Sequence, residues 1–148
     1  MFHIEDLTER DYLLENTTPY QIEIMGYVIE EHVWGKMICA VTNLLLSIFP
    51  SYKDKILTFA CPWSKAKMIS DIQKTNYRGL ECGYYINCNH TALHSCWFIQ
   101  DLFDFFMIDK SSVQFLIHRP SSAEPKHVKE YIEQRFKKNY SYYIQSKT

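Results

Sequence analysis

The stretch from Leu80 to Asp109 constrains the fold most strongly, because the period of its apolar residues changes from that of a strand to that of a helix. One face of the predicted strand carries Tyr84, Ile86 and Cys88. From Thr91 onward, apolar residues recur at steps of three and four: Ala92, Cys96, Ile99, Phe103 and Phe106. Asn89 or Thr91 is suited to cap the first helical turn. The sequence therefore predicts a strand that leads directly into a core helix.

The length and composition of the chain indicate one ordered domain. Its 148 residues are enough for a single hydrophobic core and too few for two ordinary ones. The hydrophobic share of 47% and the aromatic share of 16% exclude a disordered chain. We therefore predict one domain over 1–148, in which 1–18 is a peripheral N-terminal helix or arm and 139–148 is a C-terminal tail.

The other elements follow from shorter patterns. Two short strands around Gly26 predict a hairpin, and the apolar positions from Trp34 to the stop at Pro50 predict a buried helix. The remaining segments are predicted as follows: helices at Ile4–Asn16, Ser51–Thr58, Ser64–Ile72 and Lys126–Lys138, a turn at Asn76–Gly79, a break at Asp109–Ser112, a strand at Val113–Ile117, and an aromatic tail at Tyr140–Ile144 that suits a strand or a docking segment. The order is roughly α-β-β-α-α-β-α-β-α. This order predicts an α+β fold with a small, mainly antiparallel sheet covered by helices.

Charge and cysteine usage limit the classes of partner and the compartment. The net charge of −1 gives no strong nucleic-acid signal and no attraction to anionic membranes. No apolar run of 18 or more residues is present, so we expect no membrane association. The acidic start lacks the order of a secretory signal, and five cysteines are an odd number. We therefore expect a cytoplasmic protein with reduced thiols.

Polar residues gather at the predicted junction between the strand and the helix. The free N–H groups and the positive dipole end of a helix N-terminus are suited to hold an anion there. The candidate ligand-binding residues are Asn87, Asn89, His90, Thr91, Arg78 and Arg119. Ordinary helix capping by the same polar residues is the structural alternative.

Cysteine and histidine crowd the same region, but their spacing is not that of a strong metal motif. The residues are Cys82, Cys88, His90, His94 and Cys96. No paired C-x-x-C or HExxH pattern is present, so no metal site is predicted. The four glycines do not form a phosphate loop, and no cofactor is predicted. A cysteine- or zinc-dependent enzyme that uses Cys88, His90 and His94 remains the alternative.

The order of several segments resembles a small α+β module found alone or appended to prokaryotic restriction and other DNA-defence proteins. The matching segments are Thr18-Pro-Tyr-Gln-Ile-Glu-Ile, Tyr27-Val-Ile, Trp34-Gly-Lys, Leu45-x-x-Ile-Phe-Pro50, Tyr84-Tyr-Ile-Asn-Cys-Asn-His-Thr-Ala and Phe115-Leu-Ile. They span about Thr17 to Ile117. The resemblance implies a role in defence or counter-defence, and it carries over no catalytic residue.

These observations lead to one functional hypothesis with two alternatives. We expect a non-enzymatic binding module in a bacterial or phage defence setting that binds a phosphate-bearing ligand such as a nucleotide, or a partner protein. The abundance of tyrosine, including Tyr140 in the tail, predicts a homo-oligomer. The alternatives are the Cys88 enzyme and a pure protein-interaction protein, such as an inhibitor or adaptor, whose aromatic tail docks on a larger assembly.

Overall fold

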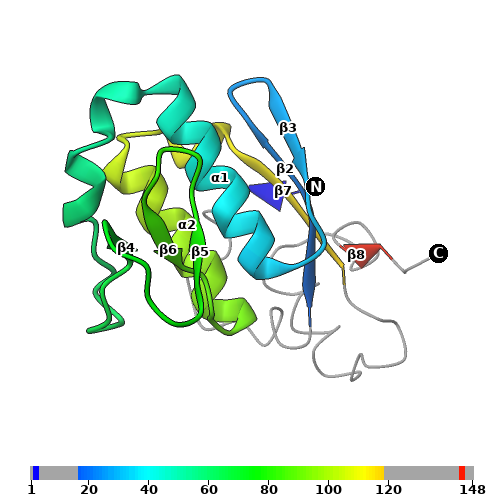
Figure 1. The fold of residues 1–148 in the computed structure, drawn as a ribbon. Helices are drawn as coiled ribbons and strands as arrows, with labels where there is room; N and C mark the ends of the chain where they lie inside the picture. Colours follow the sequence, from blue (N-terminus) through cyan, green and yellow to red (C-terminus); the bar gives the residue numbers. More distant parts are fainter. Residues whose placement is uncertain (1, 4–16, 119–143, 146–148) are drawn as a thin grey trace.

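The computed structural model of the chain describes residues 2–3, 17–118 and 144–145, and these residues form the predicted α+β fold (Figure 1). The described strands divide between a five-stranded and a three-stranded sheet instead of forming one sheet. Two α-helices, α1 (Trp34–Ile48) and α2 (Ala92–Phe105), pack against each other in the same part of the chain. The predicted class is therefore confirmed, and the division into two sheets is the feature that the sequence did not indicate.

The larger sheet is built around β7 (Gln114–His118). One edge of β7 pairs with β2 (Thr18–Ile24), which in turn pairs with β3 (Tyr27–Glu30), and both pairings are antiparallel. Two short strands also pair with β7: β1 (Phe2–His3) antiparallel and β8 (Ile144–Gln145) parallel. The sheet is therefore mainly antiparallel, as predicted, and β3 ends it on one side.

The predicted hairpin is formed by β2 and β3. Ile24 pairs with Tyr27, so Met25 and Gly26 alone make the turn. Their φ angles of 52° and 84° are both positive, as a two-residue type I′ turn requires. This turn matches the right-handed twist of the strands and fixes their register.

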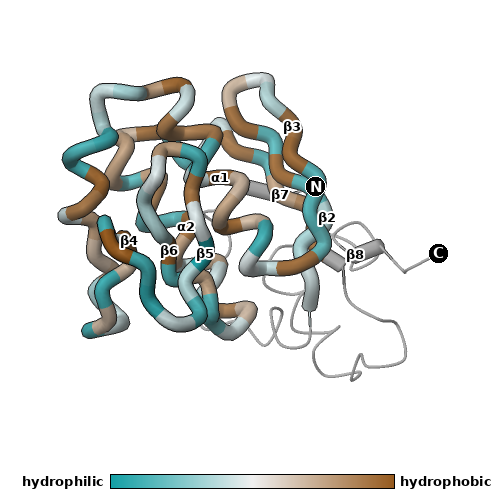
Figure 2. The backbone as a smooth tube through the Cα atoms, in the orientation of Figure 1, coloured by the Kyte–Doolittle hydropathy of each residue, from teal (hydrophilic) through white to brown (hydrophobic). Residues whose placement is uncertain are grey.

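Helix α1 lies between the two sheets (Figure 1). Its buried side includes Met37, Ile38 and Val41, and apolar and polar stretches alternate along it in Figure 2. At its start, the Trp34 ring stacks on Phe115 of β7 with 5.7 Å between the ring centroids. The helix stops before Pro50, as its sequence predicts.

The other side of α1 contacts the smaller sheet. The Cys39 thiol approaches the Gly79 carbonyl at 3.8 Å, and the Asn43 side chain accepts a hydrogen bond from the Glu81 N–H at 3.0 Å. This sheet has the order β4 (Ile69–Ser70), β6 (Tyr85–Asn87), β5 (Tyr77–Gly79), with antiparallel pairing throughout. The predicted strand before α2 is therefore the central strand of a second small sheet.

Three local predictions in the segment from residue 50 to residue 79 are wrong. The predicted helix at Ser51–Thr58 is a pair of 3₁₀ turns, η3 (Pro50–Tyr52) and η4 (Lys55–Thr58). The predicted helix at Ser64–Ile72 is irregular apart from β4, because the buried residues Ile69 and Ser70 pair with β6. The predicted turn at Asn76–Gly79 is confined to its start, where Asn76 has a φ of 68°, and β5 follows at once. Pairing with β6 outweighs the weak local preferences here.

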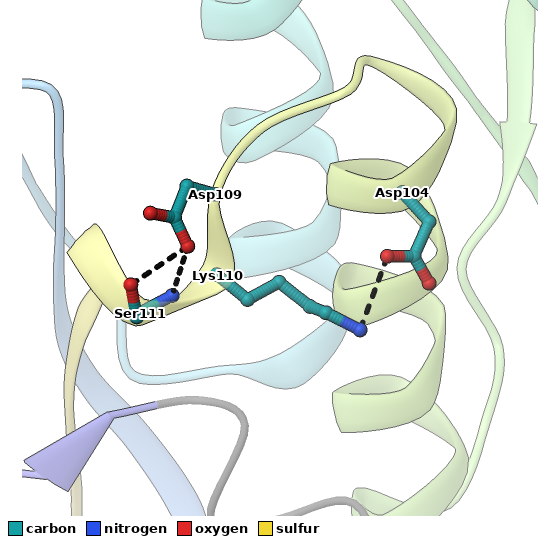
Figure 3. Close-up of polar contacts among 4 residues, drawn as sticks. All are labelled: Asp104, Asp109, Lys110 and Ser111. Atoms are coloured by element: carbon teal, nitrogen blue, oxygen red, sulfur yellow. Dashed lines mark hydrogen bonds and ion pairs between the residues drawn. The ribbon is translucent and has the colours of Figure 1, made fainter.

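Helix α2 confirms the prediction of a core helix after the strand. Its buried residues include Cys96, Phe98, Ile99 and Phe103. After α2, the chain turns through Met107, whose φ is 59°, into η5 (Lys110–Ser112) and then β7. Figure 3 shows the two polar contacts that hold this turn, an ion pair between Lys110 and Asp104 at 3.0 Å and hydrogen bonds from Ser111 to Asp109.

Several predicted segments lie outside the described residues. They are the helix at Ile4–Asn16, the helix at Lys126–Lys138, and the aromatic tail except for Ile144, which belongs to β8. Neither α1 nor α2 is long and apolar enough to cross a membrane, and the described residues contain no other candidate span.

Candidate functional site

A cleft of about 700 Å³ opens where the two sheets and the start of α1 meet. Three chain segments line most of it: residues 32–35 at the start of α1, residues 76–78 at the start of β5, and residues 88–90 after β6. Thr18 of β2 completes the lining. Polar side chains that are far apart in the sequence, such as Asn76 and His90, therefore face one space.

The N-terminus of α1 forms part of this cleft and has no side-chain cap. Val33 occupies the N-cap position and carries no hydrogen-bond acceptor, and the first turn contains no acidic residue. The first intrahelical bond made by a backbone N–H runs from Met37 to the Val33 carbonyl at 2.9 Å. The N–H groups of Trp34, Gly35 and Lys36 therefore have no partner within the helix. They place the positive end of the helix dipole at the cleft.

The N-terminus of α2 differs, because its first turn is capped. The Thr91 hydroxyl accepts a hydrogen bond from the His94 N–H at 3.1 Å. Asn87 also makes local contacts. Its side-chain oxygen lies 3.4 Å from the Asn89 backbone nitrogen, and its backbone carbonyl oxygen contacts His90 Nε2. The polar residues at this junction thus make the local hydrogen bonds of an ordinary helix start.

Arg78 brings a positive charge to the cleft. Its side chain is exposed on β5, and its Nε lies 3.5 Å from the position that a Cβ on Gly35 would occupy. The guanidinium also hydrogen bonds to the Cys88 sulfur, which lowers the pKa of that thiol. Among the described residues, no carboxylate lies within ion-pairing distance of Arg78. The cation and the uncapped start of α1 are therefore neighbours.

Gly35 allows this close approach. A Cβ at Gly35 would lie 3.2 Å from the Cys88 carbonyl oxygen and 3.5 Å from the Cys88 sulfur. The contact with the Cys88 carbonyl would be tighter than usual, so glycine allows Arg78 and the residue that follows β6 to pack closely on the first turn of α1.

Replacing Gly35 by Val is therefore expected to lower the free energy of unfolding by about 1–3 kcal/mol, because the added methyl groups would displace the Cys88 backbone. Urea unfolding of the variant measures this loss. Gly79→Val is the matched control, since nothing lies within 4 Å of the Cβ position at Gly79. Equal stabilities of the two variants would show that the contact between Gly35 and Cys88 is not tight.

Cys88, His90 and His94 do not form an activated thiol. Cys88 is buried, and burial raises the pKa of its thiol more than the Arg78 charge lowers it. His90 Nε2 lies 2.9 Å from the Asn87 carbonyl, which can only accept, so this nitrogen donates its hydrogen to the backbone. The His94 ring stacks on the Trp63 ring, with 4.7 Å between the ring centroids. This geometry favours structural roles for both histidines.

Burial also lowers the pKa of His90 below its ordinary value of 6.5, and the nearby His94 lowers it further. The unfolded chain therefore binds a proton at His90 more readily than the folded chain does. The contribution of neutral His90 to the free energy of unfolding is fully present above about pH 6.5 and is lost as the pH falls. We expect the unfolding free energy of the wild type to decrease more steeply between about pH 7 and pH 5 than that of His90→Gln. Urea unfolding at several pH values compares the two slopes, and parallel slopes would mean that His90 is not protected in the folded state.

Three of the six predicted ligand-binding residues line the cleft together: Arg78, Asn89 and His90. Asn87 and Thr91 lie beside it and make backbone hydrogen bonds, and Arg119 lies outside the described residues. The sequence analysis missed the start of α1. The sequence pattern that could have indicated this site is the apolar Val33 at the N-cap position, followed by Gly35. Val33 leaves the first turn of α1 uncapped, and Gly35 lets neighbouring atoms come close to it.

The described residues contain no group of three or more His, Cys, Asp or Glu side chains that could hold a metal ion. All five cysteines are free. Comparison with known proteins found no matching family model, curated protein or solved structure. The fold and the site define an α+β protein with a cleft that Arg78 and the uncapped start of α1 line.

Proposed function

We propose that the protein is a non-enzymatic binding module that holds the phosphate group of a small ligand, such as a nucleotide, in the cleft. One observation carries the proposal: the exposed guanidinium of Arg78, which has no carboxylate partner among the described residues, lies beside the uncapped start of α1. Backbone N–H groups at a helix start and an arginine fork are complementary to phosphate oxygens. A phosphate there would satisfy groups that lack a partner within the helix.

The rest of the cleft supports a ligand larger than phosphate alone. Its volume of about 700 Å³ is in the range of pockets that hold small organic ligands. The lining residues include the aromatic residues Tyr77 and Trp34 and the amide-bearing residues Asn76 and Asn89. His32 also reaches the cleft, but its Nε2 lies 3.9 Å from a Glu30 carboxylate, so Arg78 is the main source of positive charge.

The biological setting that we propose, bacterial or phage defence or counter-defence, rests on the resemblance of residues 17–117 to the module in DNA-defence proteins. Ligand recognition without catalysis accords with this site, because Cys88 is buried and burial raises the pKa of its thiol. A partner protein in place of the nucleotide is an outcome that the experiment below distinguishes.

Calorimetry of the purified chain against a panel of pyrophosphate, mononucleotides, cyclic nucleotides and short oligonucleotides tests the proposal. Arg78→Gln should lower the affinity for the best ligand tenfold or more, since a charge-assisted hydrogen bond contributes about 1.5–3 kcal/mol. The melting temperature should fall only slightly, because Arg78 is exposed and the substitution removes a side-chain contact with the Cys88 sulfur. Lys65→Gln removes an exposed charge outside the cleft and should leave the affinity unchanged.

Two results would overturn this function. One is that no member of the panel binds the wild type. The other is that Arg78→Gln and Lys65→Gln bind equally well, which would place the ligand elsewhere. In the first case, protein docking becomes the better hypothesis for the cleft.

A further inference from the structure

Among the residues that the structure describes, strand β3 is an open edge of the larger sheet. The strand order places β3 last, after β2, and Figure 1 shows it on the outside of the molecule. Its residues are apolar at the exposed end: Tyr27 is 53% exposed and Val28 is 58% exposed. Figure 2 shows the same hydrophobic segment at the rim of the sheet. An open, apolar edge is a template for pairing with another strand.

The pairing with β2 shows which backbone groups of β3 point outward. Ile24 and Tyr27 close a two-residue turn, so their backbones hydrogen bond to each other. In an antiparallel pair the next two opposite residues, Glu23 and Val28, do not hydrogen bond to each other. The Glu31 N–H donates to the Tyr20 carbonyl at 3.2 Å, which agrees with this alternation. The N–H and C=O of Val28 and Glu30 therefore point away from β2, toward solvent.

The hairpin tip next to this edge is strained. Met25 has a φ of 52° without being glycine, although Asn and Asp are the residues that favour this turn position. Its side chain is also 51% exposed. An exposed methionine held in a costly conformation beside Tyr27 and Val28 is typical of a contact surface and not of a turn selected for stability.

We propose that β3 pairs with β3 of a second copy of this chain, antiparallel and about a two-fold axis, with Val28 opposite the partner's Val28. In this register the two outward-facing Val28 backbones exchange both hydrogen bonds. The pair extends the sheet from one copy into the other and covers both open edges.

The side chains select this register over its neighbour. With Val28 on the axis, Tyr27 lies opposite the partner's Ile29, and Glu30 lies opposite the partner's Gly26, so apolar groups meet and carboxylates stay apart. A shift that centres the pair on Ile29 would place Val28 opposite the partner's Glu30. Such a shift exposes the apolar surface to a charge and is disfavoured.

Sedimentation of the whole chain over a wide concentration range, up to millimolar, tests the proposal. The wild type should show a monomer–dimer equilibrium, and Val28→Glu or Val28→Lys should each weaken dimerisation about tenfold or more, because like charges meet on the axis. Mixing Val28→Glu with Val28→Lys should restore a dimer, since opposite charges then face each other. Ile72→Glu, a charge at a position that is 64% exposed and outside β3, should dimerise like the wild type.

Each other outcome contradicts the proposal. A wild type that stays monomeric, or a Val28→Glu variant that dimerises like Ile72→Glu, excludes β3 as the interface. A mixture that stays monomeric excludes the register centred on Val28. At low concentration, where the wild type is monomeric, Val28→Lys should melt close to the wild type because Val28 is exposed. Val28→Glu should melt slightly lower, because its carboxylate faces Glu23 of β2 within the same copy.

Discussion

Trp34→Ala is expected to lower the free energy of unfolding by about 3–5 kcal/mol, the range for removing a large buried aromatic side chain. Trp34 is 8% exposed, its ring stacks on Phe115, and its Nε1–H donates to the Thr17 carbonyl at 2.9 Å. The residue thus joins the start of α1 to β7 and to Thr17, the residue before β2. Its loss should also weaken ligand binding, because the uncapped first turn of α1 would no longer be held at the cleft.

Trp34→Phe separates the two contributions of this residue. Phenylalanine keeps the stacking on Phe115 and removes the hydrogen bond to Thr17, so we expect a smaller loss of about 1–3 kcal/mol. Urea unfolding of both variants gives the comparison. A loss below about 1 kcal/mol for Trp34→Ala would mean that the start of α1 is not anchored through this ring.

Phe98→Ala is expected to lower the free energy of unfolding by about 3–5 kcal/mol and also to change the titration of His90. Phe98 is fully buried in α2, with ring centroids 5.3 Å from Phe59 and 5.4 Å from His90. Its removal admits water beside His90, which reduces the burial that lowers the pKa of this histidine. The pKa of His90 should therefore rise toward its ordinary value.

Phe105→Ala is the matched control on the same helix, because Phe105 is only partly buried and lies away from His90. It should cost less than Phe98→Ala and leave the pKa of His90 unchanged. Unfolding experiments and histidine NMR titrations measure both effects. If Phe98→Leu, a milder variant that keeps the fold, leaves the pKa of His90 unchanged, then Phe98 does not control the protonation of this residue.

The helices and the hairpin could be predicted because their signals are long and local. Helix α1 and helix α2 each carry more than three turns of apolar period, and the Met25-Gly26 turn separates two clear strands. Strands β4 and β5 have two and three residues, which is too short for a period to appear. Their pairing with β6 is a tertiary effect, and it also explains why the helix predicted at Ser64–Ile72 does not form.

The candidate site could be predicted in part. The polar sequence around Asn89 and Thr91 predicts an anion site at the N-terminus of α2, yet Thr91 uses its hydroxyl to cap that helix. The open helix start belongs to α1, where apolar Val33 gave no polar signal. Arg78 was predicted as a ligand, but its position beside Gly35 depends on how the smaller sheet packs against α1 and cannot be read from spacing.

A backbone NMR titration with pyrophosphate tests whether the anion binds at the start of α1. We predict that the amide signals of Gly35 and Lys36, at the uncapped start of α1, shift most and saturate together. In Arg78→Gln the same shifts should need at least about tenfold more pyrophosphate. Saturable shifts centred on His94 and Ser95 at the capped start of α2, or no saturable shift at Gly35, would contradict the account.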